Sequence, residues 1–314
     1  MLKQKVKRWR DTSPYMEPVC RALRRSVPLP ERVWRHLPFT GISDFEVAGR
    51  LVRMSHFGAE IENSLFWAGY GQGWEATTLL LWERLAQTAH VVFDVGANTG
   101  VFALAAKAAN PLAVVHAFEP MPRIAERLQA NVALNGFAVA VHRVAVSDRR
   151  GTAQIQSMAS DHEYSATLDY MAWMDHVPSS SIEVPVERLD AVIEQSGDRP
   201  DLIKIDVERH EPPVLTGLWP AVEGGPLPVL VIEILDQQIA DLVEAQVAPR
   251  GYVSFAVREH AGVARKPLQV EDGVRNWLLV PAEAIGIAGE LAKAGNMTHA
   301  QLQASRPAAS EVAR

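Results

Sequence analysis

Short apolar runs alternate with longer amphipathic stretches from about residue 74 to residue 281. Runs of strand length occupy residues 90–95, 113–118, 138–145, 201–206, 228–235, 252–257 and 277–281. Apolar residues recur every three to four positions, which predicts helices, over residues 74–89, 100–109, 121–134, 189–195 and 237–248. Strands that alternate with helices predict a mostly parallel sheet with helices on both faces.

The pattern also predicts three parts of the chain. Residues 1–72 are punctuated by prolines and predict an N-terminal helical extension or lid, because proline ends or kinks helices. Residues 73–290 form the main domain, in which 152–187 break the alternation with short strands and a polar middle. The runs 252–257 and 277–281 predict an antiparallel hairpin at the edge of the sheet. Residues 291–314 are rich in Ala, Ser and Gln and predict a flexible tail.

Composition indicates the expected cellular compartment and excludes some classes of partner. Hydrophobic residues make up 48% of the chain and charged residues 22%, as in a globular protein. Residues 1–36 are basic, but aromatic residues do not interleave with them, so no nucleic-acid partner is expected. The single Cys20 excludes an intramolecular disulfide and a cysteine-based metal site. With no long apolar run and no signal-peptide pattern, we expect a cytoplasmic protein without a membrane partner. The tryptophan-rich stretch 63–82 is a candidate surface for a homo-oligomer.

The most informative motif is Phe93-Asp-Val-Gly-Ala-Asn-Thr-Gly100, where a strand ends at Asp94 and a helix follows two glycines. Such a turn presents backbone N–H groups to a ligand at the carboxyl edge of an open sheet. The next strand ends in Glu119, at a distance typical of an acid that binds ribose hydroxyls. These features predict a cofactor that contains a nucleoside.

The residues inside the turn indicate which of these cofactors is bound. Asn98 and Thr99 stand between Gly96 and Gly100, so the middle glycine of the dinucleotide fingerprint is missing, and the phosphate-loop Gly-Lys-Ser/Thr is absent. We therefore favour S-adenosylmethionine (SAM), which carries no phosphate and whose amino group an acid such as Asp94 can help to hold. A nicotinamide oxidoreductase is the disfavoured alternative.

A second cluster of polar residues follows the apolar run 201–206. Asp206 ends that strand, and Glu208, His210 and Glu211 come within the next five residues. In a sheet wound outward from the first strand, this position borders the same crevice as the glycine turn. Glu211 also fits the start of a helix whose first turn contains Pro212.

Together these motifs resemble the FkbM family of SAM-dependent methyltransferases. The resemblance covers residues 74–281 and rests on the segments 93–100, 117–120, 188–190, 203–208 and 231–233, which come in the family's order. It implies a Rossmann-like class I methyltransferase fold, that is, α/β with a seven-stranded, mostly parallel sheet and an antiparallel last strand. One departure is Arg209, where the family usually has Gly.

The resemblance also implies roles for individual residues. Asp94, Gly96, Asn98 and Gly100 would lie along the methionine part of SAM, and Glu119 would bind its ribose. Residues 145–148, among them Ser147 and Asp148, would border the adenine.

For the chemistry, we expect methyl transfer to a hydroxyl of a small molecule such as a natural product or a sugar. His210 would be the general base, and Asp206 would orient it or the acceptor, with Glu208 beside them. Carboxyl or N-methylation and a non-catalytic SAM-binding scaffold are the alternatives. The aromatic segment 66–74 and the insert 158–176, with Tyr164, Tyr170 and Trp173, would form the acceptor pocket.

A metal is not expected, although the oxygen atoms of Asp206, Glu208 and Glu233 are of the type that Mg²⁺ prefers. Glu233 lies within an apolar strand and is interpreted as a buried acid satisfied by hydrogen bonds.

Overall fold

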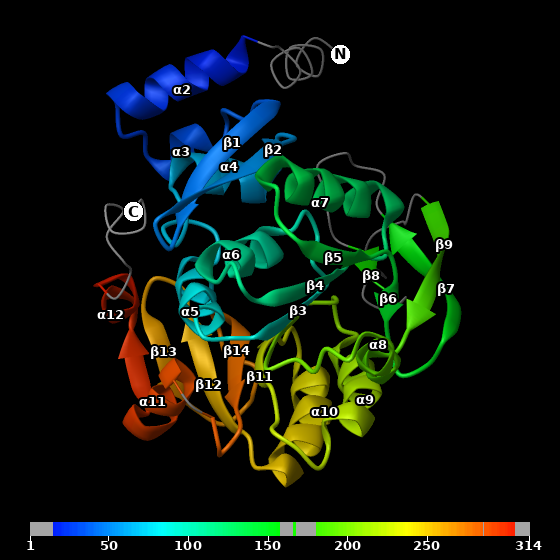
Figure 1. The fold of residues 1–314 in the computed structure, drawn as a ribbon. Coiled ribbons are helices and arrows are strands. Elements are labelled where there is room, and N and C mark those ends of the chain that lie inside the picture. The colour runs from blue at the N-terminus through cyan, green and yellow to red at the C-terminus, as the bar shows by residue number, and fades with distance from the viewer. Residues whose placement is uncertain (1–14, 158–165, 168–179, 285, 305–314) are drawn as a thin grey trace.

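A nine-stranded sheet forms the centre of the protein (Figure 1). The computed structural model describes residues 15–157, 166–167, 180–284 and 286–304. The strands lie in the order β15-β13-β12-β14-β11-β10-β3-β4-β5. Their bounds are Val91–Val95 (β3), Val114–Phe118 (β4), Val139–His142 (β5), Leu202–Ile205 (β10), Val229–Glu233 (β11), Val253–Arg258 (β12), Gly262–Arg265 (β13), Val274–Val280 (β14) and Asn296–Thr298 (β15).

Seven of these strands correspond to the seven predicted apolar runs. Strands β5, β4, β3, β10 and β11 are parallel, and β14 runs antiparallel to both of its neighbours, β11 and β12. The predicted Rossmann-like fold with an antiparallel last strand is therefore confirmed. The position of the predicted edge hairpin is wrong, because β14 is inserted between β11 and β12. Two strands that the pattern did not predict, β13 and β15, extend the sheet beyond β12.

Helices cover both faces of the sheet (Figure 1). On one face pack α5 (Ala76–Ala86), α6 (Val101–Ala109), α7 (Pro122–Asn135), α11 (Gly286–Ala294) and α12 (His299–Ala304). On the other face pack α8 (Leu189–Ser196), α9 (Glu211–Val222) and α10 (Gln237–Val247), which continues into the 3₁₀ turn Ala248–Arg250. Because the parallel strands are buried on both sides, they read as continuous apolar runs rather than as alternating ones.

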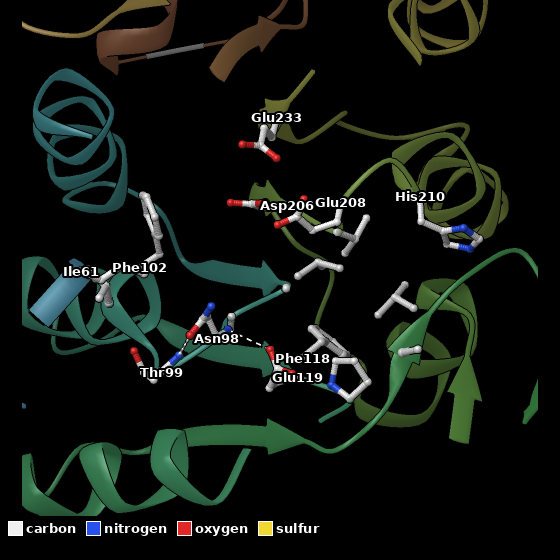
Figure 2. Close-up of a pocket in the computed structure, with 18 of the residues that line it drawn as sticks. Ile61, Asn98, Thr99, Phe102, Phe118, Glu119, Asp206, Glu208, His210 and Glu233 are labelled. Carbon is white, nitrogen blue, oxygen red and sulfur yellow. Dashed lines mark hydrogen bonds between the residues drawn. The ribbon is translucent and has the colours of Figure 1, made fainter. Parts of the chain in front are cut away.

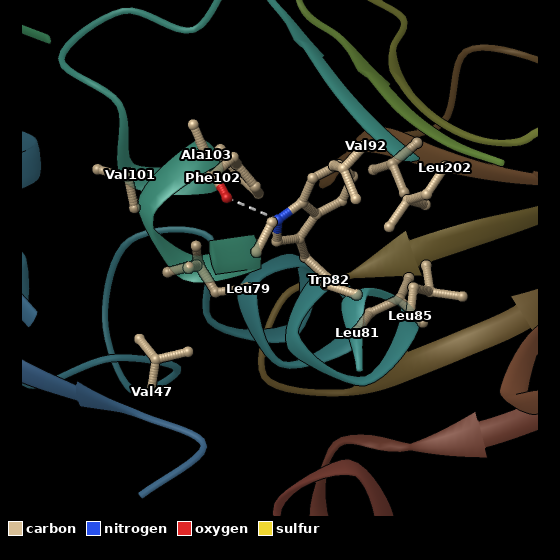
Figure 3. Packing of buried hydrophobic residues seen from close by; sticks show 14 of the residues in the cluster. Val47, Leu79, Leu81, Trp82, Leu85, Val92, Val101, Phe102, Ala103 and Leu202 are labelled. Atoms are coloured by element: carbon tan, nitrogen blue, oxygen red, sulfur yellow. Dashed lines mark hydrogen bonds between the residues drawn. The ribbon is translucent and has the colours of Figure 1, made fainter. Parts of the chain in front are cut away.

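Trp82 anchors the α5 side of the core (Figure 3). Its ring is fully buried between Phe102 of α6 and the strands, and its indole N–H donates to the Phe102 carbonyl at 2.9 Å. A buried tryptophan needs such a partner for its one polar atom. This contact fixes α5 against α6, the helix that follows the glycine turn.

A separate four-stranded sheet occupies the break in the βα alternation. Its order is β6-β9-β7-β8, with β6 at Ala145–Val146, β7 at Gly151–Ser157, β8 at Ala166–Thr167 and β9 at Ser180–Glu187. The short strands predicted within 152–187 are thus confirmed. Residues 158–165 and 168–179, including Tyr164, Tyr170 and Trp173, lie outside the described residues.

The N-terminal segment is not wholly helical. Besides α2 (Met16–Ser26), α3 (Glu31–Trp34) and α4 (Glu60–Trp67), it contains an antiparallel hairpin of β1 (Gly41–Val47) and β2 (Arg50–His56). The side chains of Asn131 and Asn135 on α7 accept the N–H groups of Ser55 and Arg53 in β2, at 2.8 Å each. The hairpin was missed because proline spacing guided the helical prediction, although buried and exposed positions alternate along both strands.

The predicted flexible tail is structured up to residue 304. Strand β15 pairs with β13, and Leu302 of α12 is fully buried. Residues 305–314 lie outside the described residues. None of the helices in the described ranges combines the length and the apolar character that a membrane span requires.

Candidate functional site

A cavity of about 360 Å³ opens at the carboxyl ends of β3, β4, β10 and β11 (Figure 2). It lies where the chain, after winding from β3 to β5, crosses back to β10 on the other side of β3. Ligands of open α/β sheets bind at such a switch point. Of the predicted site residues, the cavity is lined by Gly96, Asn98, Glu119, Asp206, Glu208 and His210.

Gly96 follows β3 and contacts the ends of β4 and β10. Its φ is +83°, and a Cβ at this position would lie 1.8 Å from the backbone oxygen of Asp206. The N–H groups of Gly96 and Ala97 both donate to the carbonyl of Phe118, at 3.0 and 2.9 Å. Only a glycine permits both the left-handed backbone and this close approach of β10.

Glu119 is held in place by the backbone around it. Its carboxylate accepts the N–H of Asn98 at 3.0 Å and that of Met121 at 2.9 Å, and the residue is 6% exposed. Burial raises the pKa of Glu119 to about 7, although these two hydrogen bonds favour the charged form. The glycine turn and the ribose-type acid are therefore one hydrogen-bonded unit.

Four predicted cofactor residues do not line the cavity. The buried Asp94 carboxylate accepts the Ala103 N–H at 2.9 Å and so satisfies the first turn of α6. Gly100 caps α6 with φ +98° and packs near Leu128. Ser147 and Asp148 follow Val144, Ala145 and Val146 in the sequence but do not line the cavity as those three residues do. The cofactor contacts expected of Asp94, Gly100, Ser147 and Asp148 remain predictions, and none of the four residues lines the cavity in this structure.

Asp206 is bound to a buried lysine. Lys204 is 1% exposed, and its Nζ donates to Asp206 at 2.8 Å while lying 4.5 Å from the centre of the Phe102 ring. Burial alone would lower the pKa of Lys204, but attraction to Asp206, Glu75 and Glu233 raises it above its ordinary value. Lys204 therefore remains charged and fixes the Asp206 carboxylate.

The loop after Asp206 follows a strained path. Glu208 and Arg209 have φ of +53° and +77°, the left-handed region that side chains disfavour. Glu211 secures this path by accepting the N–H groups of Val207 and Arg209, both at 3.2 Å. Arg209, at the position where the FkbM pattern has Gly, thus keeps a backbone conformation that Gly adopts freely.

His210 is oriented by a serine rather than by Asp206. Its Nε2 lies 2.9 Å from the Ser147 hydroxyl oxygen, and that hydroxyl donates to Asp148 at 3.1 Å. In Figure 2 the imidazole extends away from Asp206. The expectation that Asp206 orients His210 is therefore wrong, since Lys204 already holds Asp206.

Two further acids line the cavity near Asp206: Glu75, which was not predicted, and Glu233, which was interpreted wrongly. Glu75, the residue before α5, lines the cavity although no motif marks it, and burial raises its pKa to about 7. Glu233 ends β11 with 7% exposure, and it has no hydrogen bond or ion pair to any part of the chain that the structure describes. The expectation of a satisfied acid is wrong for Glu233.

The predicted aromatic pocket is only partly present. Of the segment 66–74 only Trp74 lines the cavity, where it is joined by Phe102 and Ile61. Phe66 is fully buried in a separate small core with Cys20 and Phe39. Within the described ranges, no group of three or more His, Cys, Asp or Glu side chains is arranged to hold a metal ion.

The buried acids predict how stability depends on pH. Burial raises the pKa of Asp94 and Glu119 to about 7 and that of Glu211 to about 8, whereas unfolded carboxyl groups titrate near 4. Between these values the folded protein binds more protons than the unfolded chain. The free energy of unfolding should therefore fall as pH rises from 5 to 8, by up to about 1.4 kcal/mol per pH unit for each group.

Urea unfolding at pH 5, 6, 7 and 8 measures this slope. Glu211→Gln keeps an oxygen that accepts the N–H groups of Val207 and Arg209 but cannot titrate, so its slope should be smaller than that of the wild-type protein. A midpoint that rises with pH over this range would contradict the pKa directions.

Comparison with known proteins gives one family. The Methyltransferase FkbM domain matches residues 94–249, which include the glycine turn, Glu119 and the loop after Asp206. The chain is 35% identical to the 31-O-demethyl-FK506 methyltransferase FkbM of Streptomyces tacrolimicus, over 42% of this chain and 62% of that protein. It is 32% identical to the AMB antimetabolite synthetase AmbE of Pseudomonas aeruginosa, over 41% of this chain and 8% of that protein. The chain thus spans less than two thirds of either relative.

Solved structures of methyltransferases are more distant. The SAM-dependent methyltransferase of Agrobacterium tumefaciens is 14% identical with a TM-score of 0.45, covering 81% of this chain and 80% of that one. The O-methyltransferase TomG of Streptomyces achromogenes is 15% identical with a TM-score of 0.38, covering 65% and 77%.

Proposed function

The chain belongs to the FkbM methyltransferase family, and from this premise we propose that it transfers a methyl group from SAM to a hydroxyl of a small molecule. The observation that carries the proposal is the hydrogen-bonded unit of Gly96, Asn98 and Glu119 on a cavity at the switch point of the sheet. The matched FkbM relative is an O-methyltransferase by its name, which supports oxygen as the acceptor atom.

The residues of the cavity fit SAM. Glu119 offers a carboxylate to ribose hydroxyls, and the backbone of the turn from Gly96 to Thr99 lines the space beside it. Val144–Val146 and Ile155 supply an apolar wall of the kind that an adenine ring packs against. When bound, SAM supplies an electrophilic methyl group, so the protein mainly aligns the acceptor and manages its proton.

His210 is the proposed proton acceptor. Because the Ser147 hydroxyl donates to Asp148, its oxygen accepts from the Nε2–H of His210. When the imidazole is neutral, this hydrogen bond leaves the lone pair on Nδ1, and a neutral imidazole is a suitable base near pH 7. Asp206, fixed by Lys204, is the group proposed to orient the acceptor.

His210→Ala should slow methyl transfer by about 10²- to 10⁴-fold, the usual contribution of a general base. The assay follows radiolabelled methyl from SAM onto a panel of hydroxylated acceptors, with S-adenosylhomocysteine (SAH) affinity measured in parallel. SAH should bind the variant as it binds the wild-type protein, because His210 is proposed to act on the acceptor.

Ser147→Ala is the matched variant, because it keeps the imidazole but removes the group that sets its tautomer. It should displace the pH–rate profile while SAH binding is retained. Full activity of His210→Ala would show that another group accepts the proton, and SAH binding without transfer to any acceptor would favour a non-catalytic protein.

A further inference from the structure

The strand order divides the cavity into two halves. Gly96, Asn98 and Glu119 lie at the ends of β3 and β4, on the side proposed for the cofactor. Asp206, Glu208 and Glu233 lie at the ends of β10 and β11, which are the next strands in the sheet on the other side of β3. The second half is therefore where the acceptor would bind.

This acceptor half carries an excess of acids. Glu75 and Glu233 line it together with Asp206 and Glu208, and like charges at close range are unfavourable. The facing cations are Lys204, which is buried and bound to Asp206, and Arg275, whose side chain lies at the exposed rim. Within the described residues no cation is bonded to Glu75 or Glu233, because Lys204 is bound to Asp206.

The carboxyl group of Glu233 has no hydrogen-bond partner among the described residues. The residue is 7% exposed, it faces the cavity, and no described residue bonds to its side chain (Figure 2). Its charged neighbours are Asp206, Lys204, Glu208 and Glu75, of which only Lys204 attracts it. A buried carboxyl group without a hydrogen bond is unfavourable, and such groups in native proteins usually have a functional reason. We therefore expect the Glu233 carboxyl group to bind a ligand in the cavity.

The chemistry of that ligand follows from the charge. An anionic acceptor is disfavoured beside these acids, and a neutral hydroxyl donates one hydrogen bond but brings no positive charge that would favour their ionised forms. A protonated amine brings three N–H donors and a positive charge. We propose that the acceptor carries a protonated amine and that Glu233 binds it; this rests on the proposed methyltransferase function and names its substrate class.

Binding of the amine should release a proton. Burial and the neighbouring acids raise the pKa of Glu233 to about 10, which favours its protonated form in the free protein. A cation at Glu233 favours the carboxylate, and the proton of Glu233 leaves as the amine binds.

Calorimetry on the full chain saturated with SAH tests the proposal. The probes are trans-4-aminocyclohexanol and trans-1,4-cyclohexanediol, which differ in one amine, and the titrations are run at pH 7.5 in two buffers of different ionisation enthalpy. We expect the amine to bind at least tenfold more tightly than the diol and to release a proton. Glu233→Gln should lose both effects while keeping its fold, since glutamine resembles the neutral acid. Glu244→Gln, on the exposed side of α10, should keep both.

Three results would overturn the proposal: equal affinity for the two probes, a preference for the amine that survives in Glu233→Gln, or proton release on titration with Mg²⁺ but not with the amine. Saturation with SAH is itself checked first. Failure of SAH to bind would reject the proposed function, whereas SAH binding without a preference for the amine would reject only this inference.

Discussion

Gly96→Ala is expected to abolish SAM binding and to lower the free energy of unfolding by about 2–5 kcal/mol. The left-handed backbone alone accounts for about 1–2 kcal/mol, and a methyl group forced into a packed contact adds about 1–3 kcal/mol. Here the added carbon would lie 1.8 Å from the backbone oxygen of Asp206, which cannot rotate away. Any relief separates the ends of β3 and β10 and so deforms the cavity.

Gly136→Ala separates the two contributions. Gly136 caps α7 with φ +63°, but nothing lies within 4 Å of a Cβ at that position. It should therefore lose only the about 1–2 kcal/mol of backbone strain and bind SAM as the wild-type protein does. Urea unfolding and SAM calorimetry on both variants provide the measurement. Equal losses in the two, or SAM binding by Gly96→Ala, would contradict the close approach of the strands.

Lys204→Met is expected to lower the free energy of unfolding by about 3 kcal/mol. Removing one partner of a buried ion pair leaves the other charge uncompensated, which typically costs about 3–5 kcal/mol. We place the loss at the lower end because the Asp206 side chain keeps 26% exposure and can be hydrated. Glu75 and Glu233 lose the same nearby cation.

A double-mutant cycle with Asp206→Asn tests whether the pair itself is responsible. If it is, the double variant should be more stable than the sum of the two single losses implies. Lys293→Met, at an exposed position of α11, is the control and should leave stability unchanged. A Lys204→Met protein as stable as this control would mean that the buried charge is not needed.

Much of the fold and half of the site followed from local pattern. The predicted strands and helices lie within a few residues of β3, α6, β4, α7, β10 and β11. These elements were predictable because the strands are continuous apolar runs and the helices are amphipathic. Gly96, Glu119 and Asp206 were brought together correctly, since the carboxyl ends of adjacent parallel strands share one edge.

The parts of the site that could not be predicted depend on contacts between residues far apart in the sequence. The partner of His210 is Ser147, 63 positions away, and nothing in the loop 206–211 points to it. Asp94 was expected along the methionine part of SAM; that contact remains a prediction, and the structure adds that its carboxylate accepts the N–H of Ala103 in α6. Glu233 was assigned a hydrogen bond because buried acids usually have one, and the sequence could not reveal that the fold provides none.

The most direct test of a SAM site at this edge of the sheet is calorimetric titration of SAM into the wild-type protein, Glu119→Ala and Glu126→Ala. Glu119 lines the cavity, whereas Glu126 is exposed on α7. The wild-type protein and Glu126→Ala should bind one SAM with equal affinity. Glu119→Ala should bind it about 10- to 100-fold more weakly, the effect of losing hydrogen bonds to a charged group. Absence of SAM binding, or equal affinity in Glu119→Ala, would contradict the account.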